Sequence, residues 1–217
     1  MTYLDAINKV LRRLREDEVT SVTANAYSKL IGEYINDAKR LVEDAWDWQA
    51  LRETVVLSTV AGTADYTLTG LNSSFKTLSV LNTTGSNELY AADNQWINKQ
   101  VYLNSAGGST GTPAYYAYTG FTDSGDATVT VYPKPDKVYD IRFNVVNRTE
   151  DFTLGTELLK VVPSAVVQYA TGFAMEERGE TGGQSGSSLL GQAKYTLGDA
   201  ISLDAARFPL ETIWVNY

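Results

Sequence analysis

Apolar residues in the first fifty positions recur every three or four residues, which is the spacing of one face of an α-helix. A first short helix is predicted to end near Arg15, because its apolar stripe consists of Leu4, Ile7, Leu11 and Leu14. A second, longer helix is predicted after a turn, from the stripe Tyr27, Ile31, Tyr34, Ala38, Leu41, Ala45 and Trp48, which Leu30, Ile35 and Val42 widen on its flanks. Because an indole buries a large apolar area, we expect Trp48 to lie in the core.

The pattern changes from about Arg52 to Asn147, where Thr, Val, Tyr, Asn and Gly predominate. β-Branched and aromatic residues favour strands, whereas Gly, Pro, Asn and Asp favour the turns between them. Short strands are therefore predicted at 54–60, 65–68, 76–82, 96–103, 114–119, 127–132 and 139–146. Strands at a spacing of roughly 8 to 12 residues indicate a β-sandwich or a barrel.

A helical pattern returns in the last third of the chain. Pro163 suits the first turn of a helix and Gly179 suits a helix C-terminus, so a third helix is predicted between them. A fourth helix is predicted over 188–206, where Leu and Ala recur at helical spacing. The intervening segment 180–187 is rich in Gly and Ser, and we predict a flexible linker there.

These elements predict an α+β protein with four helices in an antiparallel bundle. A β-sandwich or barrel-like domain is inserted between the second and third helices, and an extended arm follows the fourth. The predicted boundaries are 1–51 for the first two helices, 52–150 for the inserted all-β domain, 151–206 for the last two helices and 207–217 for the arm.

The last eleven residues are rich in apolar side chains, although chain termini are usually polar. The arm contains Arg207, Phe208, Pro209, Leu210, Ile213, Trp214, Val215 and Tyr217. One interpretation is that this segment folds back as an edge strand on its own sheet. We favour the other, that it docks on another subunit or protein, because an exposed aromatic segment suits strand addition or groove filling.

Composition narrows the chemistry that this protein can perform. The chain of 217 residues has 18 basic and 26 acidic side chains, a net charge of −8, and neither Cys nor His. Disulfides, Cys/His metal sites and catalysis by Cys or His are therefore excluded. Carboxylate pairs remain, including Asp136 with Asp140 and Glu176 with Glu177, but turns and polar helix faces explain them without catalysis. We expect no enzymatic activity, no cofactor and no metal.

The charge also bears on partners and location. An acidic surface repels a phosphate backbone, so a sequence-independent grip on nucleic acid is not expected. The N-terminal segment lacks the apolar stretch of a signal peptide, and no run approaches 18 uninterrupted apolar residues. We therefore expect a soluble protein that is made inside the cell and contacts no membrane.

Several short motifs carry a family resemblance that extends over nearly the whole chain. They are Ala45-Trp-Asp-Trp48 after the second helix, Val55-Val-Leu57, Gly111-Thr-Pro-Ala-Tyr-Tyr-Ala-Tyr118, Val129-Thr-Val-Tyr-Pro-Lys-Pro-Asp136 and Tyr139-Asp-Ile-Arg-Phe143. In this arrangement the chain resembles the head-to-tail adaptor proteins of tailed phages, including the tail tubular protein A type.

The resemblance implies a structural protein of the virion rather than an enzyme. Such adaptors form a ring, commonly of twelve copies, below the portal protein, and they continue the DNA channel toward the tail tube or nozzle, to which tail fibres also attach. It implies that the C-terminal segment, here Arg207 to Tyr217, inserts between portal subunits. Genomic DNA would pass through the lumen during ejection without specific binding, and a negative lumen would let it slide.

Two further sets of residues are candidates for contacts of such an adaptor, one set with the neighbouring subunit and the other with the tail. A ring uses heterologous interfaces, in which one face of a subunit meets a different face of its neighbour. The polar face of the second helix is the candidate interface, through Glu33, Asp37, Lys39, Arg40 and Glu43. Loops of the β domain are candidates for the tail-facing side, with Asn82, Asn87, Gly107 and Gly111.

Two other functions stay open from the sequence. The aromatic-rich β domain is compatible with a receptor- or carbohydrate-binding tail protein, since aromatic rings stack on sugars. A hydrolase that uses carboxylates is the third, and it would lose activity when Glu43, Asp44, Asp47, Asp136 or Asp140 is changed to the amide.

Overall fold

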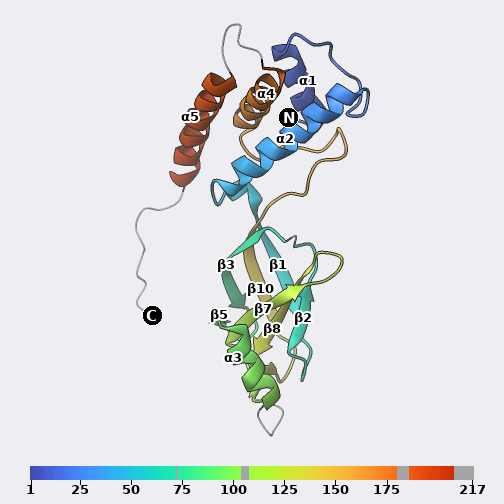
Figure 1. Cartoon of the computed structure of the whole chain (residues 1–217). Coiled ribbons are helices and arrows are strands. Elements are labelled where there is room, and N and C mark those ends of the chain that lie inside the picture. Colours follow the sequence, from blue (N-terminus) through green and yellow to red (C-terminus); the bar gives the residue numbers. More distant parts are fainter. Residues whose placement is uncertain (72, 104–107, 180–185, 208–217) are drawn as a thin grey trace. The chain divides into compact units, whose positions relative to one another are not determined.

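The computed structural model describes residues 1–71, 73–103, 108–179 and 186–207 (Figure 1). The chain divides into two compact units. The first unit, here called the helical unit, combines Met1–Leu51 with the chain from Glu150 onward. The second, here called the β unit, is Arg52–Thr149.

The helical unit begins with α1 (Tyr3–Arg13) and α2 (Ala26–Asp44), and each helix starts at a polar cap. Thr2 and Asn25 are the N-cap residues, and each forms a capping box with the residue three positions later. Such caps satisfy backbone N–H groups that have no partner within the helix. The first helix therefore lies where it was predicted, with Ile7, Val10 and Leu11 buried.

The second helix ends earlier than predicted. After α2 the chain turns at Ala45 and enters a short 3-10 helix, η1 (Gln49–Leu51). Trp48 is buried as expected, and its indole Nε1 donates to the backbone oxygen of Val42 at 2.8 Å. The predicted apolar stripe was wrong at Leu41 and Ala45, which are exposed, because the buried face turns toward Ile35 and Val42.

The helical unit is completed by α4 (Pro163–Arg178) and α5 (Gly186–Ala205). Pro163 lies in the first turn of α4, and Gly179 ends the helix with a left-handed φ of 64°, as predicted. Helix α4 packs against α1, α2 and α5 (Figure 1). Its approach to α5 is close, since a Cβ atom on Gly172 would lie 2.6 Å from Cδ2 of Leu190.

The β unit contains two four-stranded sheets and a short two-stranded one. One sheet has the order β1-β10-β3-β4, from β1 (Arg52–Ser58), β10 (Asp140–Asn147), β3 (Phe75–Asn82) and β4 (Asn87–Glu88). The other has the order β2-β8-β7-β5, from β2 (Asp65–Leu68), β8 (Ala127–Tyr132), β7 (Tyr115–Phe121) and β5 (Tyr90–Ala91). The third pairs β6 (Thr110–Gly111) with β9 (Lys134–Pro135) in parallel.

The two larger sheets share one hydrophobic core. Val80, Ile141 and Phe143 come from the first sheet, and they pack in one cluster with Tyr116 and Val129 of the second. The rings of Tyr116 and Phe143 meet edge to face, with centroids 5.8 Å apart. Inward-facing side chains from both sheets thus form the interior, as in a β-sandwich.

One predicted strand is wrong. Residues 96–103 form the end of helix α3 (Asn94–Asn98) and a π-helical turn, η2 (Lys99–Leu103), instead of a strand. Asp93 caps α3 by accepting from the amide of Trp96, and Ile97 and Val101 are buried one helical turn apart. The described residues therefore contain five α-helices, and the four-helix prediction missed the one inside the β unit.

Candidate interaction surfaces

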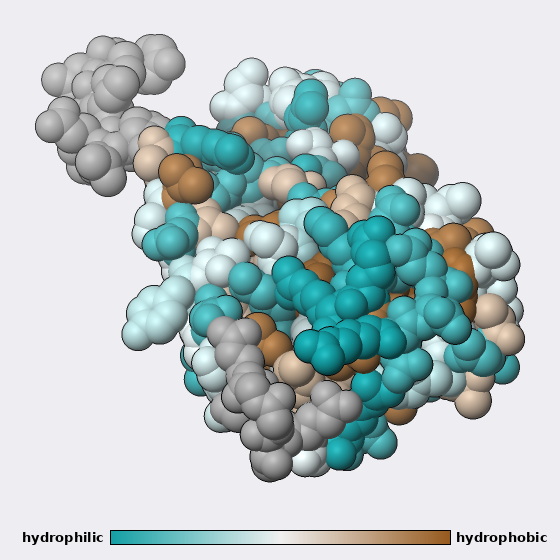
Figure 2. Space-filling view, turned by 90° about the horizontal axis from the view of Figure 1, so that it is seen from above, coloured by the Kyte–Doolittle hydropathy of each residue, from teal (hydrophilic) through white to brown (hydrophobic). Residues whose placement is uncertain are grey.

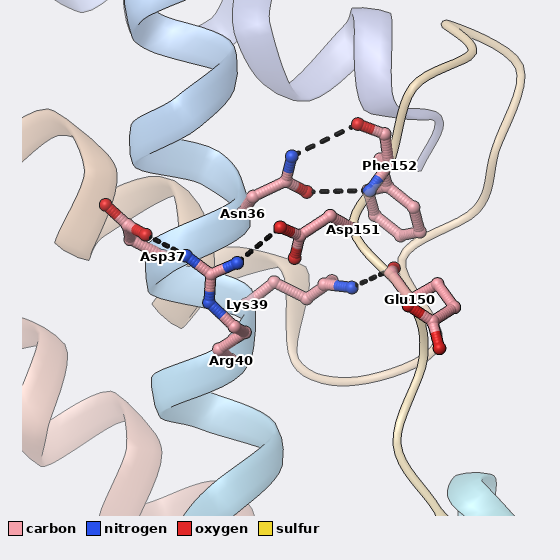
Figure 3. Close-up of polar contacts among 7 residues, drawn as sticks. All are labelled: Asn36, Asp37, Lys39, Arg40, Glu150, Asp151 and Phe152. Atoms are coloured by element: carbon pink, nitrogen blue, oxygen red, sulfur yellow. Dashed lines mark hydrogen bonds and ion pairs between the residues drawn. The ribbon is translucent and has the colours of Figure 1, made fainter. Parts of the chain in front are cut away.

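Helix α2 holds the chain segment that re-enters the helical unit after the β unit (Figure 3). The side-chain amide of Asn36 donates to the backbone oxygen of Phe152 at 3.1 Å, and its Oδ1 accepts from the amide of Phe152 at 2.9 Å. Both bonds are buried. Asn36 thus satisfies both backbone groups of one residue and fixes this segment on the helix.

Lys39 and Glu43 were predicted on the exposed polar face of the second helix, and that prediction is wrong. Lys39 is fully buried and Glu43 is 1% exposed. Lys39 Nζ donates to the backbone oxygen of Glu150 and lies 4.5 Å from the ring centroid of Phe152 (Figure 3). Burial lowers the pKa of Lys39, although the nearby carboxylate of Glu43 opposes that shift. These two residues belong to the interior of the protomer.

The other three candidates on this helix, Glu33, Asp37 and Arg40, are exposed. The Arg40 guanidinium pairs with Asp37, three residues earlier, and with Asp151 of the re-entering segment (Figure 3). These two ion pairs raise the pKa of Arg40. The exposed side of α2 therefore presents a guanidinium that is held between two carboxylates.

Carboxylates also surround Tyr34 on α2. Its ring meets the ring of Phe173 on α4 edge to face, with centroids 6.2 Å apart. Burial raises the pKa of Tyr34, and the charges of Glu177, Glu33 and Asp37 raise it further. An aromatic pair bordered by negative charge thus joins the exposed parts of α2 and α4. Figure 2 shows hydrophilic side chains gathered on the face seen from above, with smaller hydrophobic patches among them.

The root of the predicted arm is held by a buried aspartate at the end of α5. Asp204, near the end of α5, is only 5% exposed. It accepts hydrogen bonds from Trp46 and Gln49, and it forms an ion pair with Arg207 at 3.2 Å. An Asp close to the end of a helix that is rich in Leu and Ala gives no signal of this contact, since Asp199 of the same helix is exposed. The other predicted arm residues lie outside the described part of the chain: Phe208, Pro209, Leu210, Ile213, Trp214, Val215 and Tyr217.

The predicted tail-facing loop from Asn82 to Asn87 is held by side-chain hydrogen bonds at both of its ends. Asn82 is 1% exposed, and its Oδ1 accepts from the amide of Gly85 at 2.7 Å. Asn87 Nδ2 donates to the backbone oxygen of Pro113 at 2.9 Å. Gly111 lies in strand β6, and Gly107 lies outside the described residues. The exposed part of the first loop is therefore its tip, and Asn82 forms the base.

A surface that was not predicted lies on the β unit near β5. Tyr90 is 62% exposed, Trp96 is 40% exposed and Tyr115 is 39% exposed. Tyr90 and Tyr115 are direct partners in the pairing of β5 with β7, and Trp96 packs edge to face on Tyr115 at 5.3 Å. The strand predicted over 96–103 gives no reason for Trp96 to meet Tyr90 and Tyr115, so the sequence does not predict a common patch of the three rings.

The candidate catalytic carboxylates are used in structural contacts. Asp136 accepts from the hydroxyl of Tyr139 at 2.7 Å, and Asp140 accepts from the hydroxyl of Ser58 at 2.7 Å. Within the residues that the structure covers, no group of three or more carboxylates could hold a metal ion. The exposed surfaces described above, on α2 and on the β unit, are the candidates for binding other molecules.

Comparison with known proteins gives one result. A family model described as SU10 adaptor protein matches residues 1–209, which include both units. A search of curated proteins found no match. Among the described residues, no helix is long and apolar enough to cross a membrane.

Proposed function

Since this chain belongs to the SU10 adaptor protein family and is a structural phage adaptor, we propose that it forms a ring below the portal protein and extends the DNA channel toward the tail. The observation that carries the proposal is the family match over residues 1–209, which spans both units. A structural adaptor family implies a non-enzymatic component of the virion, made in the host cytoplasm. Its partners are then the portal protein and a tail nozzle or tail tube protein, with tail fibres as a further partner.

We propose a dodecameric ring in which α2 contributes to the subunit interface. The supporting observation is the exposed network of Asp37, Arg40 and Asp151, with Glu33 beside it. The guanidinium is already held in place by its partners, so little side-chain entropy is lost when a neighbour binds there. Twelve copies at −8 each carry about −96 in total, and a negative lumen lets DNA slide without sticking.

The arm from Arg207 onward is proposed as the element that docks on the portal. Its support is the apolar and aromatic composition after α5, which suits insertion between subunits. The loop of the β unit between Asn82 and Asn87, and the segment from Gly107 to Gly111, are proposed to face the tail. The helical residues 1–51 and 151–206 then form the ring body, and 52–150 forms the tail-facing domain.

The test mixes the protein with the portal protein of the same genome and measures complex size by size exclusion with light scattering. Full-length protein is compared with a version that ends at Ala206. We expect the full-length protein to co-elute at one copy per portal subunit, and the shortened one to elute alone. If both bind, the adaptor function holds and the docking element lies elsewhere. If neither binds, the proposed portal contact is wrong.

The exposed rings of Tyr90, Trp96 and Tyr115 favour a second candidate function, recognition of a receptor or carbohydrate by the β unit. Aromatic rings that are half exposed and packed together can stack on sugar rings. A glycan array separates the two functions. Glycan binding that is lost in Trp96→Ala, together with no portal binding, would favour this second function.

A further inference from the structure

Asp204 accepts hydrogen bonds from three donors, two of which come from a segment far away in the sequence. Its Oδ2 accepts from the indole Nε1 of Trp46 at 3.2 Å and from the backbone amide of Gln49 at 3.1 Å. Its Oδ1 accepts from Nη1 of Arg207 at 3.2 Å. Trp46 and Gln49 follow α2, more than 150 positions earlier in the chain.

The burial of this carboxylate makes these bonds important. Asp204 is 5% exposed, whereas Arg207 is mostly exposed. A buried carboxylate loses its hydration and must be compensated by donors, and hydrogen bonds to a charged acceptor are stronger than those to a neutral one. The last turn of α5 is therefore fixed to the segment after α2, one residue before the helix ends at Ala205.

We propose that Asp204 is the positioning residue that sets where and in which direction the portal-docking arm leaves the helical unit. The inference rests on the proposed function of the arm. Arg207 is the first residue of that arm, and it is bound directly to Asp204. A fixed root raises the effective concentration of the arm at its docking site, because fewer arm positions compete with the bound one.

The structure suggests how a loss of Asp204 acts. Without the carboxylate, the indole of Trp46 and the amide of Gln49 lose their acceptor, and Arg207 loses its counter-charge. The end of α5 is then no longer fixed to the segment after α2. The arm keeps its sequence and its contact residues, but it starts from a variable position.

The experiment measures the affinity for the portal protein of Asp204→Ala in the full-length chain and in a chain that ends at Arg207. We expect Asp204→Ala to weaken portal binding of the full-length protein by about tenfold, the factor of one strong hydrogen bond to a charged group. In the chain that ends at Arg207, the same substitution changes nothing further. Asp199→Asn, an exposed carboxylate on the same helix, is the matched control and retains full affinity.

A milder variant covers the case in which Asp204→Ala does not fold. Trp46→Phe removes one donor to the carboxylate and keeps an aromatic ring, so we expect a smaller loss of affinity, again only when the arm is present. Circular dichroism confirms that each variant keeps its helices.

Each result decides the question. Unchanged portal affinity in folded Asp204→Ala overturns the inference, and so does an equal loss in the chain without the arm, which indicates a general structural role. If removal of the arm leaves portal binding intact, the proposed function of the arm fails first, and the inference falls with it. Loss in the full-length chain alone supports both.

Discussion

The side chain of Asn36 pairs with the backbone of Phe152 through two hydrogen bonds, as one strand residue pairs with another. The helical unit uses this device twice, because Asn8 also donates to the backbone oxygen of Val19 and accepts from its amide, both at 2.9 Å. In each case a helix residue fixes an irregular segment by satisfying its backbone. Asn8 thus holds the connection between α1 and α2, and Asn36 holds the segment that returns from the β unit to the helical unit.

The Asn36 pairing gives a prediction about stability. Asn36→Ala leaves the amide and carbonyl of Phe152 buried without partners, so we expect the free energy of unfolding to fall by about 2–4 kcal/mol. Urea unfolding followed by circular dichroism measures the change. Glu33→Ala, at an exposed position of the same helix, is the control and changes stability by less than about 0.5 kcal/mol. Equal stability of Asn36→Ala and the control would contradict the assignment.

Two glycines of the α4–α5 pair should respond to alanine in opposite directions. A Cβ atom on Gly172 would lie 2.6 Å from Cδ2 of Leu190, whereas Gly191 has no atom within 4 Å of that position. We expect Gly172→Ala to destabilise by about 1–3 kcal/mol through overpacking. Gly191→Ala should stabilise by up to about 1 kcal/mol, because alanine favours helix.

Thermal unfolding of the two glycine variants measures both effects. Adding Leu190→Ala to Gly172→Ala makes room for the new methyl group, so the double variant should lose less than the two single losses combined. A neutral Gly172→Ala would show that the two helices separate at little cost.

Tyr118 makes the stability of the β unit depend on pH in the alkaline range. Burial raises the pKa of Tyr118 from 10.0 to about 12, although its hydrogen bond with Thr77 opposes the shift. Between these values the folded state keeps the phenol proton and the unfolded chain loses it, so stability falls as pH rises from 10 toward 12. Tyr118→Phe should flatten that fall, as measured by urea midpoints at several pH values. An unchanged slope would refute the assignment.

Arg40 should separate folding from assembly. Because Arg40 and both its carboxylate partners are about half exposed, we expect Arg40→Ala to lower the free energy of unfolding by less than about 1 kcal/mol. Under the proposed ring, Arg40→Glu places a third negative charge beside Asp37 and Asp151 and reduces ring formation on the portal. Light scattering of the portal complex measures ring formation. A normal ring with Arg40→Glu would remove this face from the interface.

Regular elements with strong periodicity could be predicted from the sequence. The first helix, the third helix between Pro163 and Gly179, and the strands 65–68 and 127–132 lie where the pattern placed them. Their residues carry local signals, such as caps, a helix-ending glycine and β-branched residues, that agree with the burial found. Family membership also followed from short motifs that include Trp48 and the Pro133–Asp136 bend, and the family match confirms it.

Residues 96–103 were misassigned because their apolar side chains fit two periods. Trp96, Val101 and Leu103 resemble a strand composition, yet Ile97 and Val101 are spaced by four and Asp93 supplies an N-cap. Short apolar runs are ambiguous between helix and strand, and the cap was the signal that could have decided. The packing of Ile97 and Val101 with Ala64 and Ala117 shows which period the tertiary structure used.

The burial of Lys39 and Glu43 could not be predicted, since charged residues on a helix are exposed by default. Lys39 contacts a segment more than 100 positions away, where its Nζ donates to the backbone oxygen of Glu150. The role of Asp204 depends in the same way on Trp46 and Gln49. Long-range polar contacts of single residues leave no periodic trace in a sequence.

The two ends of the β unit are neighbours, because β1 starts at Arg52, which pairs directly with Val146 near the end of β10. An inserted segment whose ends meet can be exchanged for another without changing the distance that the host unit must span. Residues 52–149 can therefore be exchanged as one cassette while the helical unit is kept. Such an exchange needs only that the new insert brings its own pair of adjacent terminal strands.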